Sequence, residues 1–301
     1  MPLAPSEPPA AAAGTWTLGD LTVNRLGLGA MRLTHVGPLD LDAPSDRAKS
    51  VEVLRRAVEL GVDHLDTAAF YYSSLRSANE LINTALAPYP DDLVIVTKVG
   101  PGRHATGEFY SATPGQLRGQ VEENLRQLGR DHLDVVNLRR MRQDSIAEHF
   151  GALNELREAG LIRHLGLANA RPRHLAEALA IAPVVCVQNR FNTEVRMHDD
   201  MLRLCGEQGI AFVPYYAIAG ERRENGRDRE QDTAELLDIA HAHGASAAQV
   251  KLAWTLHQGP HVLAIPGTGN PAHLVENIAA ASLRLTEDEV ARLSATAGDR
   301  G

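Results

Sequence analysis

Eight short apolar runs, separated by loops and amphipathic helical segments, constrain the fold of this chain more than any other feature. Most are continuous hydrophobic stretches, as expected for strands buried on both faces of a parallel sheet. Regular alternation with helices predicts right-handed βαβ units, and eight strands favour a closed barrel over a doubly wound sheet. No G-x-G-x-x-G motif follows the first run, which argues against a doubly wound dinucleotide-binding domain. The runs span residues 26–30, 62–67, 93–99, 133–138, 164–168, 184–188, 210–215 and 262–266.

The segments between the runs carry signals for helix starts and ends. Thr113, Pro114 and Gln116 match an N-cap, a proline in the first helical position and the glutamine of a capping box. Gly129 marks the end of the same helix. Further start signals stand at Asp232 with Glu235, Ser246 with Gln249, Thr286 with Glu289, and Asn270-Pro271. The sequence therefore predicts the α/β class and a (β/α)₈ TIM barrel.

The region before the first run predicts two further features. A β-hairpin turning at Gly19-Asp20 is expected ahead of the barrel, and the Pro- and Ala-rich residues 1–14 are expected to be a disordered N-terminal tail. The tail has neither a basic segment nor an apolar segment of the kind found in secretory signals. No linker-like composition follows, so residues 15–301 are predicted to form a single barrel domain.

Charge and cysteine content narrow the functional classes. The 30 Lys and Arg residues against 38 Asp and Glu residues give a net charge of -8, which argues against nucleic acid and anionic membrane surfaces as partners. No apolar run approaches the roughly 20 residues of a membrane span. Cys186 and Cys205 lack metal-ligand spacing and are expected to be reduced core residues, so a cytoplasmic protein without a metal site is predicted. The oligomeric state is left open.

Polar residues that end the apolar runs are the candidates for chemistry, because active sites of such barrels lie at the carboxyl ends of the strands. Asp66 ends the second run, Lys98 the third and Arg139 the fourth, and Tyr71 follows Asp66 closely. Each residue alone has an ordinary structural interpretation as a cap, a solvated loop residue or a packing residue. Together they suggest a function, because a carboxylate keeps an adjacent lysine charged and that charge lowers the pKa of a nearby phenol from about 10. A phenol tuned in this way is a suitable proton donor to a carbonyl oxygen.

These motifs resemble the aldo-keto reductase family. Asp66-Thr67-Ala68-x-x-Tyr71 looks like the family motif with the catalytic Asp and Tyr, Val96-Thr97-Lys98 resembles the segment with its Lys, and the likeness extends from about residue 16 to 293. The resemblance implies reduction of a small-molecule aldehyde or ketone by NADPH, with NADH as the alternative cofactor. It makes Tyr71 the general acid and Asp66 and Lys98 the pair that tunes it. Tyr72 remains an alternative acid.

The fourth catalytic position of the family, usually His, falls on Arg139. The run DVVNLR that ends at Arg139 resembles the corresponding run in a bacterial subgroup of the family, which includes pyridoxal reductase. An arginine stays charged, so it cannot act as a neutral acid, but it can polarise a carbonyl or bind an anionic substituent. A structural ion pair with Asp66 or another carboxylate is the alternative interpretation.

The resemblance also implies a cofactor site. Asn169 and Gln188 would bind the nicotinamide carboxamide, Tyr215 would stack on the ring, and Ala168 replaces the usual Ser. Backbone amides near Gly267 and the helix start at Pro271 would bind phosphate, although Gly267 and His273 stand where many relatives have Lys and Arg. Residues 221–230, with four arginines, would either cover the cofactor or form a solvated loop. The full set of expected cofactor contacts is Gly29, Ala30, Met31, Asn169, Gln188, Tyr215, Gly267, Thr268, His273, Glu276 and Asn277.

Two other functions remain open from sequence alone. One is the same chemistry on a ketosugar or on an intermediate of natural-product biosynthesis. The other is a weakly active nicotinamide-binding regulatory subunit, against which the complete set of Asp66, Tyr71 and Lys98 argues.

Overall fold

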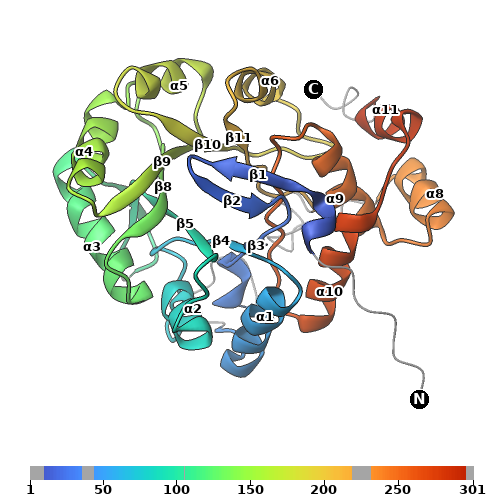
Figure 1. Ribbon diagram of the computed structural model, residues 1–301, viewed down its shortest axis with the longest axis horizontal. Helices are drawn as coiled ribbons and strands as arrows, with labels where there is room; N and C mark the ends of the chain where they lie inside the picture. The colour runs from blue at the N-terminus through green and yellow to red at the C-terminus, as the bar shows by residue number, and fades with distance from the viewer. Residues whose placement is uncertain (1–9, 36–43, 105, 219–231, 296–301) are drawn as a thin grey trace.

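A curled parallel sheet surrounded by helices forms the centre of the computed structural model (Figure 1). The structure describes all residues except 1–9, 36–43, 105, 219–231 and 296–301. The sheet has seven strands in the order β11-β10-β9-β8-β5-β4-β3, and each pairs in parallel with its neighbours. Their bounds are β3 Leu28–Gly29, β4 His64–Asp66, β5 Val94–Val99, β8 Leu133–Arg139, β9 Ile162–Ala168, β10 Val184–Gln188 and β11 Ala211–Phe212.

The eighth apolar run closes the sheet into a barrel without forming a regular strand. On one side of this run, Leu263 N donates to the carbonyl of Phe212 and Phe212 N donates to the carbonyl of His261. On the other side, Gly27 N donates to Ala264 O at 2.9 Å and Gly29 N donates to Pro266 O at 3.1 Å. Pro266 has no N–H to donate, which helps to explain why pairing along this run is limited to isolated bridges. The (β/α)₈ architecture predicted from the sequence is confirmed, with this seam as its irregular part.

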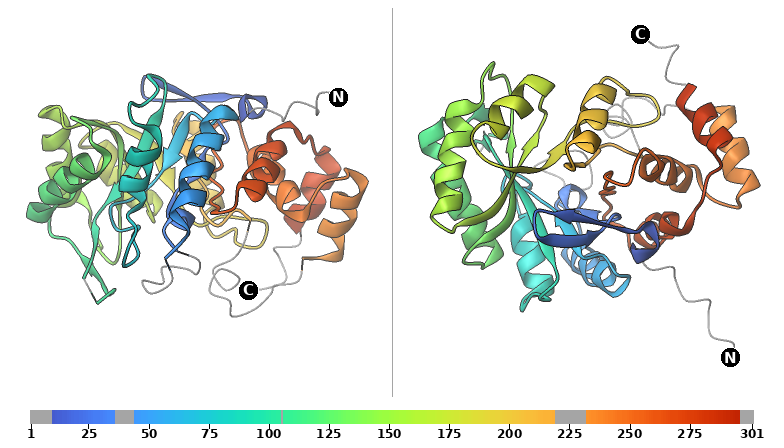
Figure 2. Two further views of the ribbon diagram at one scale, coloured as in Figure 1. Left: turned by 90° about the horizontal axis from the view of Figure 1, so that it is seen from below. Right: turned by 45° about the horizontal axis from the view of Figure 1, so that its top comes forward.

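Ten α-helices are described, and those that follow the strands surround the barrel (Figures 1 and 2). Their apolar stripes face the sheet, as in α1, where Val53, Leu54 and Ala57 are fully buried. The bounds are α1 Arg47–Glu59, α2 Ala78–Leu86, α3 Leu117–Leu128, α4 Ala147–Glu158, α5 Pro172–Leu179, α6 Asp199–Glu207, α8 Ala234–Ala242, α9 Ala247–His257, α10 Pro271–Ala279 and α11 Glu287–Ala295. The remaining described elements are four short 3₁₀ segments and a second hairpin. The 3₁₀ segments are η1 Ala10–Ala13, η2 Met31–Leu33, η3 Pro114–Gln116 and η4 Ala280–Ser282, and the hairpin consists of β6 Pro101–Arg103 and β7 Phe109–Ser111.

Most of the predicted helix signals are confirmed. The capping boxes at Thr113 and Ser246 form, Gly129 ends α3 with a φ of 64°, and the Asn270 side chain caps α10. The predicted start of α8 is wrong by one residue, because Thr233 caps this helix. Asp232 instead forms an ion pair with the buried Lys251, with 2.8 Å between Nζ and Oδ1. The ammonium group of Lys251 is nearly inaccessible to water, so it competes successfully for this carboxylate.

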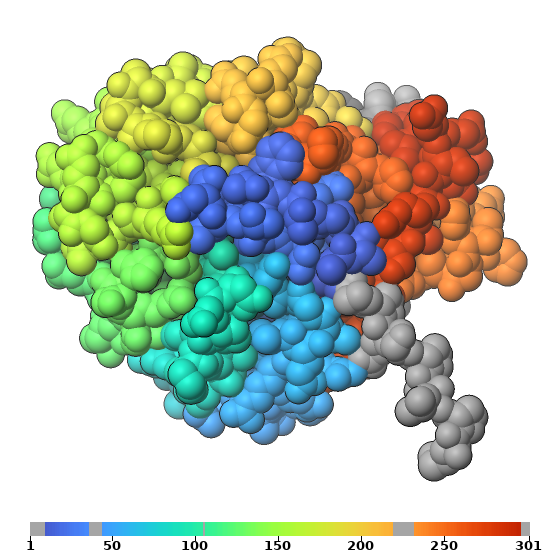
Figure 3. Space-filling view, viewed as in Figure 1, coloured from blue at the N-terminus to red at the C-terminus, as the bar shows by residue number. Residues whose placement is uncertain are grey.

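The predicted hairpin, β1 Thr15–Leu18 and β2 Leu21–Asn24, lies across one end of the barrel (Figures 2 and 3). Leu18 and Val23 are buried and join the apolar side chains inside the barrel, such as Val96 and Val135. Asp20 in the turn pairs with Arg163 and His164, which lie at the start of β9. The hairpin therefore plugs the end at which the strands begin, and the opposite end remains for a site.

The prediction of a disordered tail over residues 1–14 is corrected for Ala10–Ala13, which form the 3₁₀ segment η1. Ala10 is fully buried and its N–H donates to the carbonyl of Leu60 at 2.8 Å. The methyl groups of these alanines pack against η4, and the burial of apolar surface offsets part of the conformational entropy lost on ordering the segment. Residues 1–9 lie outside the described residues.

Both cysteines of the chain, Cys186 and Cys205, are buried and unpaired, as predicted. Burial raises the pKa of each thiol to about 12, so both are unreactive core side chains. None of the helices in the described ranges is long and apolar enough to cross a membrane.

Candidate active site

A cavity of about 460 Å³ opens at the carboxyl ends of the barrel strands. Its polar wall comes from successive strand ends, with Asp66 on β4, Lys98 on β5, Arg139 on β8 and Gln188 on β10. Every site residue predicted from the sequence lines this cavity except Ala30. Ala30 is buried directly behind the wall, where its N–H donates to the carbonyl of Asp66 at 2.8 Å. The strand topology thus brings together residues that are far apart in the sequence.

Asp66 and Lys98 form a buried ion pair at the base of the cavity. Lys98 Nζ lies 2.5 Å from Asp66 Oδ1 and also donates to the carbonyl oxygen of Thr67 at 3.0 Å. Gln188 Nε2 donates to the second carboxylate oxygen of Asp66 at 2.9 Å. The exposed fractions are only 5% for Asp66 and 4% for Lys98, so the pair is held away from water.

The protonation state of Lys98 follows from two opposing effects. Burial alone lowers the pKa of Lys98, because a charged ammonium is poorly solvated there. The negative charge of Asp66 and the neighbouring Tyr71 favour the ammonium and outweigh burial, so the pKa of Lys98 is raised. Lys98 is therefore a fixed positive charge at the base of the cavity.

Two adjacent tyrosines are placed differently with respect to this charge. Tyr71 lines the cavity, and the centroid of its ring lies 5.0 Å from Lys98 Nζ. Tyr72 does not line the cavity, because its hydroxyl donates to the carbonyls of Arg103 at 3.1 Å and His104 at 3.3 Å. Only Tyr71 thus combines contact with the cavity and proximity to the ammonium.

Arg139 ends β8 and contributes a second cation to the wall. Its guanidinium carbon lies 5.5 Å from the centroid of the Phe70 ring. Within the described part of the chain, no ion pair is formed by Arg139, and both oxygens of Asp66 are already taken by Lys98 and Gln188. The structural ion pair considered from the sequence does not form with Asp66.

Two amide side chains, Asn169 and Gln188, form a complementary pair of hydrogen-bonding groups on the wall. Asn169 has a φ of 57°, a conformation that asparagine adopts more readily than most residues, and its Oδ1 accepts from the hydroxyl of Tyr215 at 2.8 Å. This leaves Asn169 Nδ2 as a donor, and the bond from Gln188 to Asp66 leaves Gln188 Oε1 as an acceptor. A primary carboxamide such as that of nicotinamide needs one donor and one acceptor, so the residues present fit this group.

Part of the cavity wall next to Asp66 is formed by the backbone of two glycines. Gly29 and Gly267 approach so closely that a Cβ on Gly267 would lie 2.9 Å from the Gly29 carbonyl oxygen. Beyond them α10 begins at Pro271, and Thr268 and Asn277 are nearly buried there. A helix N-terminus beside a glycine-lined backbone offers N–H groups to an anion.

Several lining residues are not among the catalytic and cofactor contacts predicted from the sequence. They are Arg32, Phe70, Tyr216, Ala217, Ile218, Ala248, Ile265 and Pro266. Most are apolar, and an apolar side chain carries no signal in a sequence that separates a cavity wall from a core. Tyr216 has a φ of 61°, which is rare for an aromatic residue, but the sequence does not disclose backbone angles. The arginine-rich loop at 221–230 lies outside the described residues.

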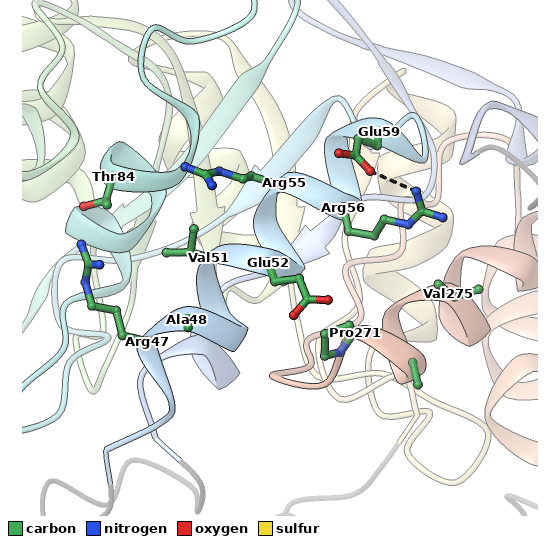
Figure 4. Close-up of a pocket in the computed structure, with 11 residues that line it drawn as sticks. Arg47, Ala48, Val51, Glu52, Arg55, Arg56, Glu59, Thr84, Pro271 and Val275 are labelled. Carbon is green, nitrogen blue, oxygen red and sulfur yellow. Dashed lines mark hydrogen bonds and ion pairs between the residues drawn. The ribbon is translucent and has the colours of Figure 1, made fainter.

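A larger hollow of about 790 Å³ lies on the outside of the barrel (Figure 4). It runs between α1 and α10, and Arg47, Glu52 and Arg55 project from α1 along it. None of the strand-end residues lines this hollow. Its charged walls belong to solvent-facing helix surfaces, and it contains no arrangement that resembles the Asp66 and Lys98 pair.

Comparisons with known proteins agree with the site geometry. The model of the aldo/keto reductase family matches residues 25–297. The chain is 43% identical over 289 residues to pyridoxine 4-dehydrogenase of Escherichia coli, covering 93% of this chain and 97% of that protein. Among solved structures, it is similar to the thermostable aldo-keto reductase Tm1743, with a TM-score of 0.78, 31% identity and coverage of 94% and 99% of the two chains. It is also similar to an aldo/keto reductase of Klebsiella pneumoniae solved with NADP and acetate, with a TM-score of 0.76, 26% identity and 93% coverage of both chains. The chain therefore belongs to the aldo/keto reductase family.

Proposed function

We propose that this protein is an NADPH-dependent reductase that converts an aldehyde to an alcohol, with pyridoxal as its substrate. The observation that carries the proposal is the buried pair of Asp66 and Lys98 beside Tyr71 at the base of the cavity. The relative in Escherichia coli is named pyridoxine 4-dehydrogenase, which supports the substrate, and the Klebsiella pneumoniae structure with NADP supports the cofactor.

The residues of the site have distinct roles in this reaction. A reduced nicotinamide, when bound, would supply the hydride for the carbonyl carbon. Tyr71 donates the proton that the carbonyl oxygen takes up as its π bond breaks. Lys98 stabilises the phenolate left on Tyr71, and Asp66 keeps Lys98 charged and in place. Asn169, which accepts a hydrogen bond from Tyr215, and Gln188 would hold the carboxamide of the nicotinamide.

Arg139 supports pyridoxal in particular. Pyridoxal carries an ionisable ring oxygen next to its aldehyde, and a guanidinium binds such an oxyanion with a charge-assisted hydrogen bond. Arg139 lies on the same cavity wall as Tyr71 and packs against Phe70, a flat apolar surface beside which an aromatic substrate can lie.

Initial rates with pyridoxal and with benzaldehyde, each with NADPH and with NADH, test the proposal. We expect Arg139→Met to lower kcat/KM for pyridoxal by roughly 10- to 100-fold more than for benzaldehyde, which lacks the neighbouring oxygen. Arg139→Lys should recover part of the loss, since it keeps the charge without the planar fork.

Three results would contradict parts of the proposal. Equal losses on both aldehydes would assign Arg139 to general polarisation of the carbonyl. A parent enzyme that ignores pyridoxal but reduces ketoses would favour the ketosugar reductase. Failure to reduce any carbonyl despite binding NADPH would favour the regulatory subunit.

The cellular setting is also part of the proposal. We place the enzyme in the cytoplasm, because its two buried thiols remain unpaired and its net charge is -8. Fractionation of the cells that produce it, with detection of the protein in each fraction, checks this placement.

A further inference from the structure

We propose that Arg32 binds a phosphate group of the cofactor, a role that neither the sequence motifs nor the comparisons assign to it. The inference rests on the proposed function, because it assumes a nicotinamide dinucleotide in the cavity. It concerns the part of the cavity wall that includes Gly267, Thr268 and His273.

Barrel closure places Arg32 next to the loop that begins at Gly267. Arg32 lies in η2, directly after β3, and the bridge between Gly29 and Gly267 joins these two parts of the chain. Arg32 lines the cavity together with Gly267, Thr268 and His273. Two segments that are more than 200 residues apart therefore form one wall.

Two glycines leave space beside Arg32. A Cβ on Gly267 would lie 3.6 Å from Arg32 Cγ, and a Cβ on Gly269 would lie 3.1 Å from the Arg32 carbonyl oxygen. The Cγ of Arg32 thus lies beside the backbone of Gly267, and the Arg32 carbonyl lies beside Gly269. A larger side chain at residue 267 would take up the space next to this stem.

The distribution of charge in the cavity distinguishes Arg32 from the other cations. Among the described lining residues, the side chains with permanent or readily acquired positive charge are Arg32, Lys98, Arg139 and His273. Lys98 lies near the end of β5 beside Tyr71, and Arg139 lies at the end of β8 beside Phe70. Arg32 is the permanently charged group at the α10 end, where the helix N-terminus also favours an anion.

The position of Arg32 compensates for the lack of a permanent cation at Gly267 and His273. The sequence has Gly and His where a cation is expected for the 2′-phosphate of NADPH, which weakens the basis for preferring this cofactor. A guanidinium binds phosphate through two parallel hydrogen bonds, so one arginine from η2 can take over this function. The phosphate is either the 2′-phosphate or the diphosphate, and binding measurements separate these two sources.

Calorimetric titration of the full chain with NADPH and NADH tests the inference without relying on turnover. We expect Arg32→Met to raise the Kd for NADPH by roughly 10- to 100-fold, the usual effect of losing a charge-assisted hydrogen bond. A loss confined to NADPH identifies the 2′-phosphate, and an equal loss with NADH identifies the diphosphate. Arg32→Lys should retain part of the affinity, and raising the salt concentration should narrow the difference between parent and Arg32→Met.

Arg118→Met is the matched control, because Arg118 is an exposed residue of α3 that does not line the cavity. It removes the same charge and should leave both Kd values unchanged. Unchanged binding of both nucleotides by Arg32→Met would overturn the inference while leaving the proposed function intact. A parent protein that binds neither nucleotide would instead overturn the proposed function.

Discussion

Tyr71 and Tyr72 show how a single position determines chemistry in this site. They are adjacent in the sequence, yet Tyr71 lines the cavity near Lys98, whereas the hydroxyl of Tyr72 is bound to the backbone of the β6–β7 hairpin. Proton transfer requires a donor within hydrogen-bond reach of the substrate oxygen. The two side chains have the same intrinsic chemistry, so their surroundings make the difference.

Replacing Tyr71 with Phe should lower kcat for aldehyde reduction by roughly 10²- to 10⁴-fold, the usual effect of losing a general acid. The Kd for NADPH, measured by calorimetry, should stay nearly the same because the hydroxyl acts on substrate. Tyr72→Phe is the matched control and should keep most activity, since it loses only contacts to Arg103 and His104. The opposite pattern would make Tyr72 the acid.

Replacing Lys98 with Met should remove most activity while leaving the cofactor bound. The ammonium of Lys98 lies 5.0 Å from the centroid of the Tyr71 ring, where a positive charge stabilises the oxyanion that remains after the hydroxyl donates its proton. Without this charge kcat for aldehyde reduction should fall, whereas the Kd for NADPH, measured by calorimetry, should stay nearly the same. A Lys98→Met variant with the kcat of the parent would show that Lys98 does not assist Tyr71.

A second variant separates this electrostatic effect from damage to the fold. Lys98→Met leaves the carboxylate of Asp66 buried without its partner, which is typically destabilising by about 3–5 kcal/mol. The double variant Asp66→Asn with Lys98→Met removes both charges and should recover much of the lost stability in urea unfolding. Its activity should remain low, because the charge beside Tyr71 is still absent.

At the scale of elements, the sequence is most informative where a local signal is strong. The capping box at Thr113 and the left-handed Gly129 depend on residues within a few positions of each other, and both are found where expected. The start of α8 at Thr233 was misplaced because a partner distant in sequence, Lys251, takes the side chain of Asp232. Tertiary contacts of this kind leave no local pattern.

The hairpin element provides a prediction about stability and pH. Hydrogen bonds from Arg163, then from His164, hold the pKa of Asp20 well below its usual value of 3.8. Because folding lowers this pKa, the interactions of Asp20 contribute their full stabilisation when the pH is above the pKa of Asp20 in the unfolded state. The stabilisation is lost as the pH falls toward the pKa of Asp20 in the folded state. Asp20→Asn should therefore lower the urea midpoint slightly at pH 7, because the pair is exposed. The difference from the parent should shrink as the pH falls below about 3.8.

Asp91→Asn makes the same change of charge at an exposed residue before β5 and serves as the control. Its urea midpoint should follow that of the parent across this pH range. A difference between parent and Asp20→Asn that persists undiminished at low pH would show that the carboxylate of Asp20 does not fasten the hairpin.

At the scale of the whole molecule, the site residues that lie in recognisable motifs could be predicted, whereas Arg32 and most of the apolar wall could not. Asp66, Tyr71 and Lys98 lie in short motifs at strand ends, so the barrel topology alone brings them together. Arg32 belongs to the site only because the chain closes between Gly29 and Gly267. The sequence gives the number of strands, but the register and side chains at the closure depend on packing of the complete barrel.

The closure also predicts how cofactor binding changes the dynamics of the molecule. β8 and β9 are joined along most of their length, whereas the run 262–266 is held by isolated bridges, including Gly27 N to Ala264 O and Gly29 N to Pro266 O. Amides at this seam should therefore exchange with deuterium faster than those of β8 in the free protein.

A dinucleotide that contacts both Gly29 and Gly267 binds the closed seam in preference to the open one. Saturating NADPH at free concentration [L] should therefore slow exchange at the seam by roughly the factor 1 + [L]/Kd, up to the limit set by global unfolding. Mass spectrometry of peptides covering 26–32 and 262–268 measures this effect, with peptides of β8 as the internal reference. Equal slowing in both regions would mean that the seam opens only with the whole barrel.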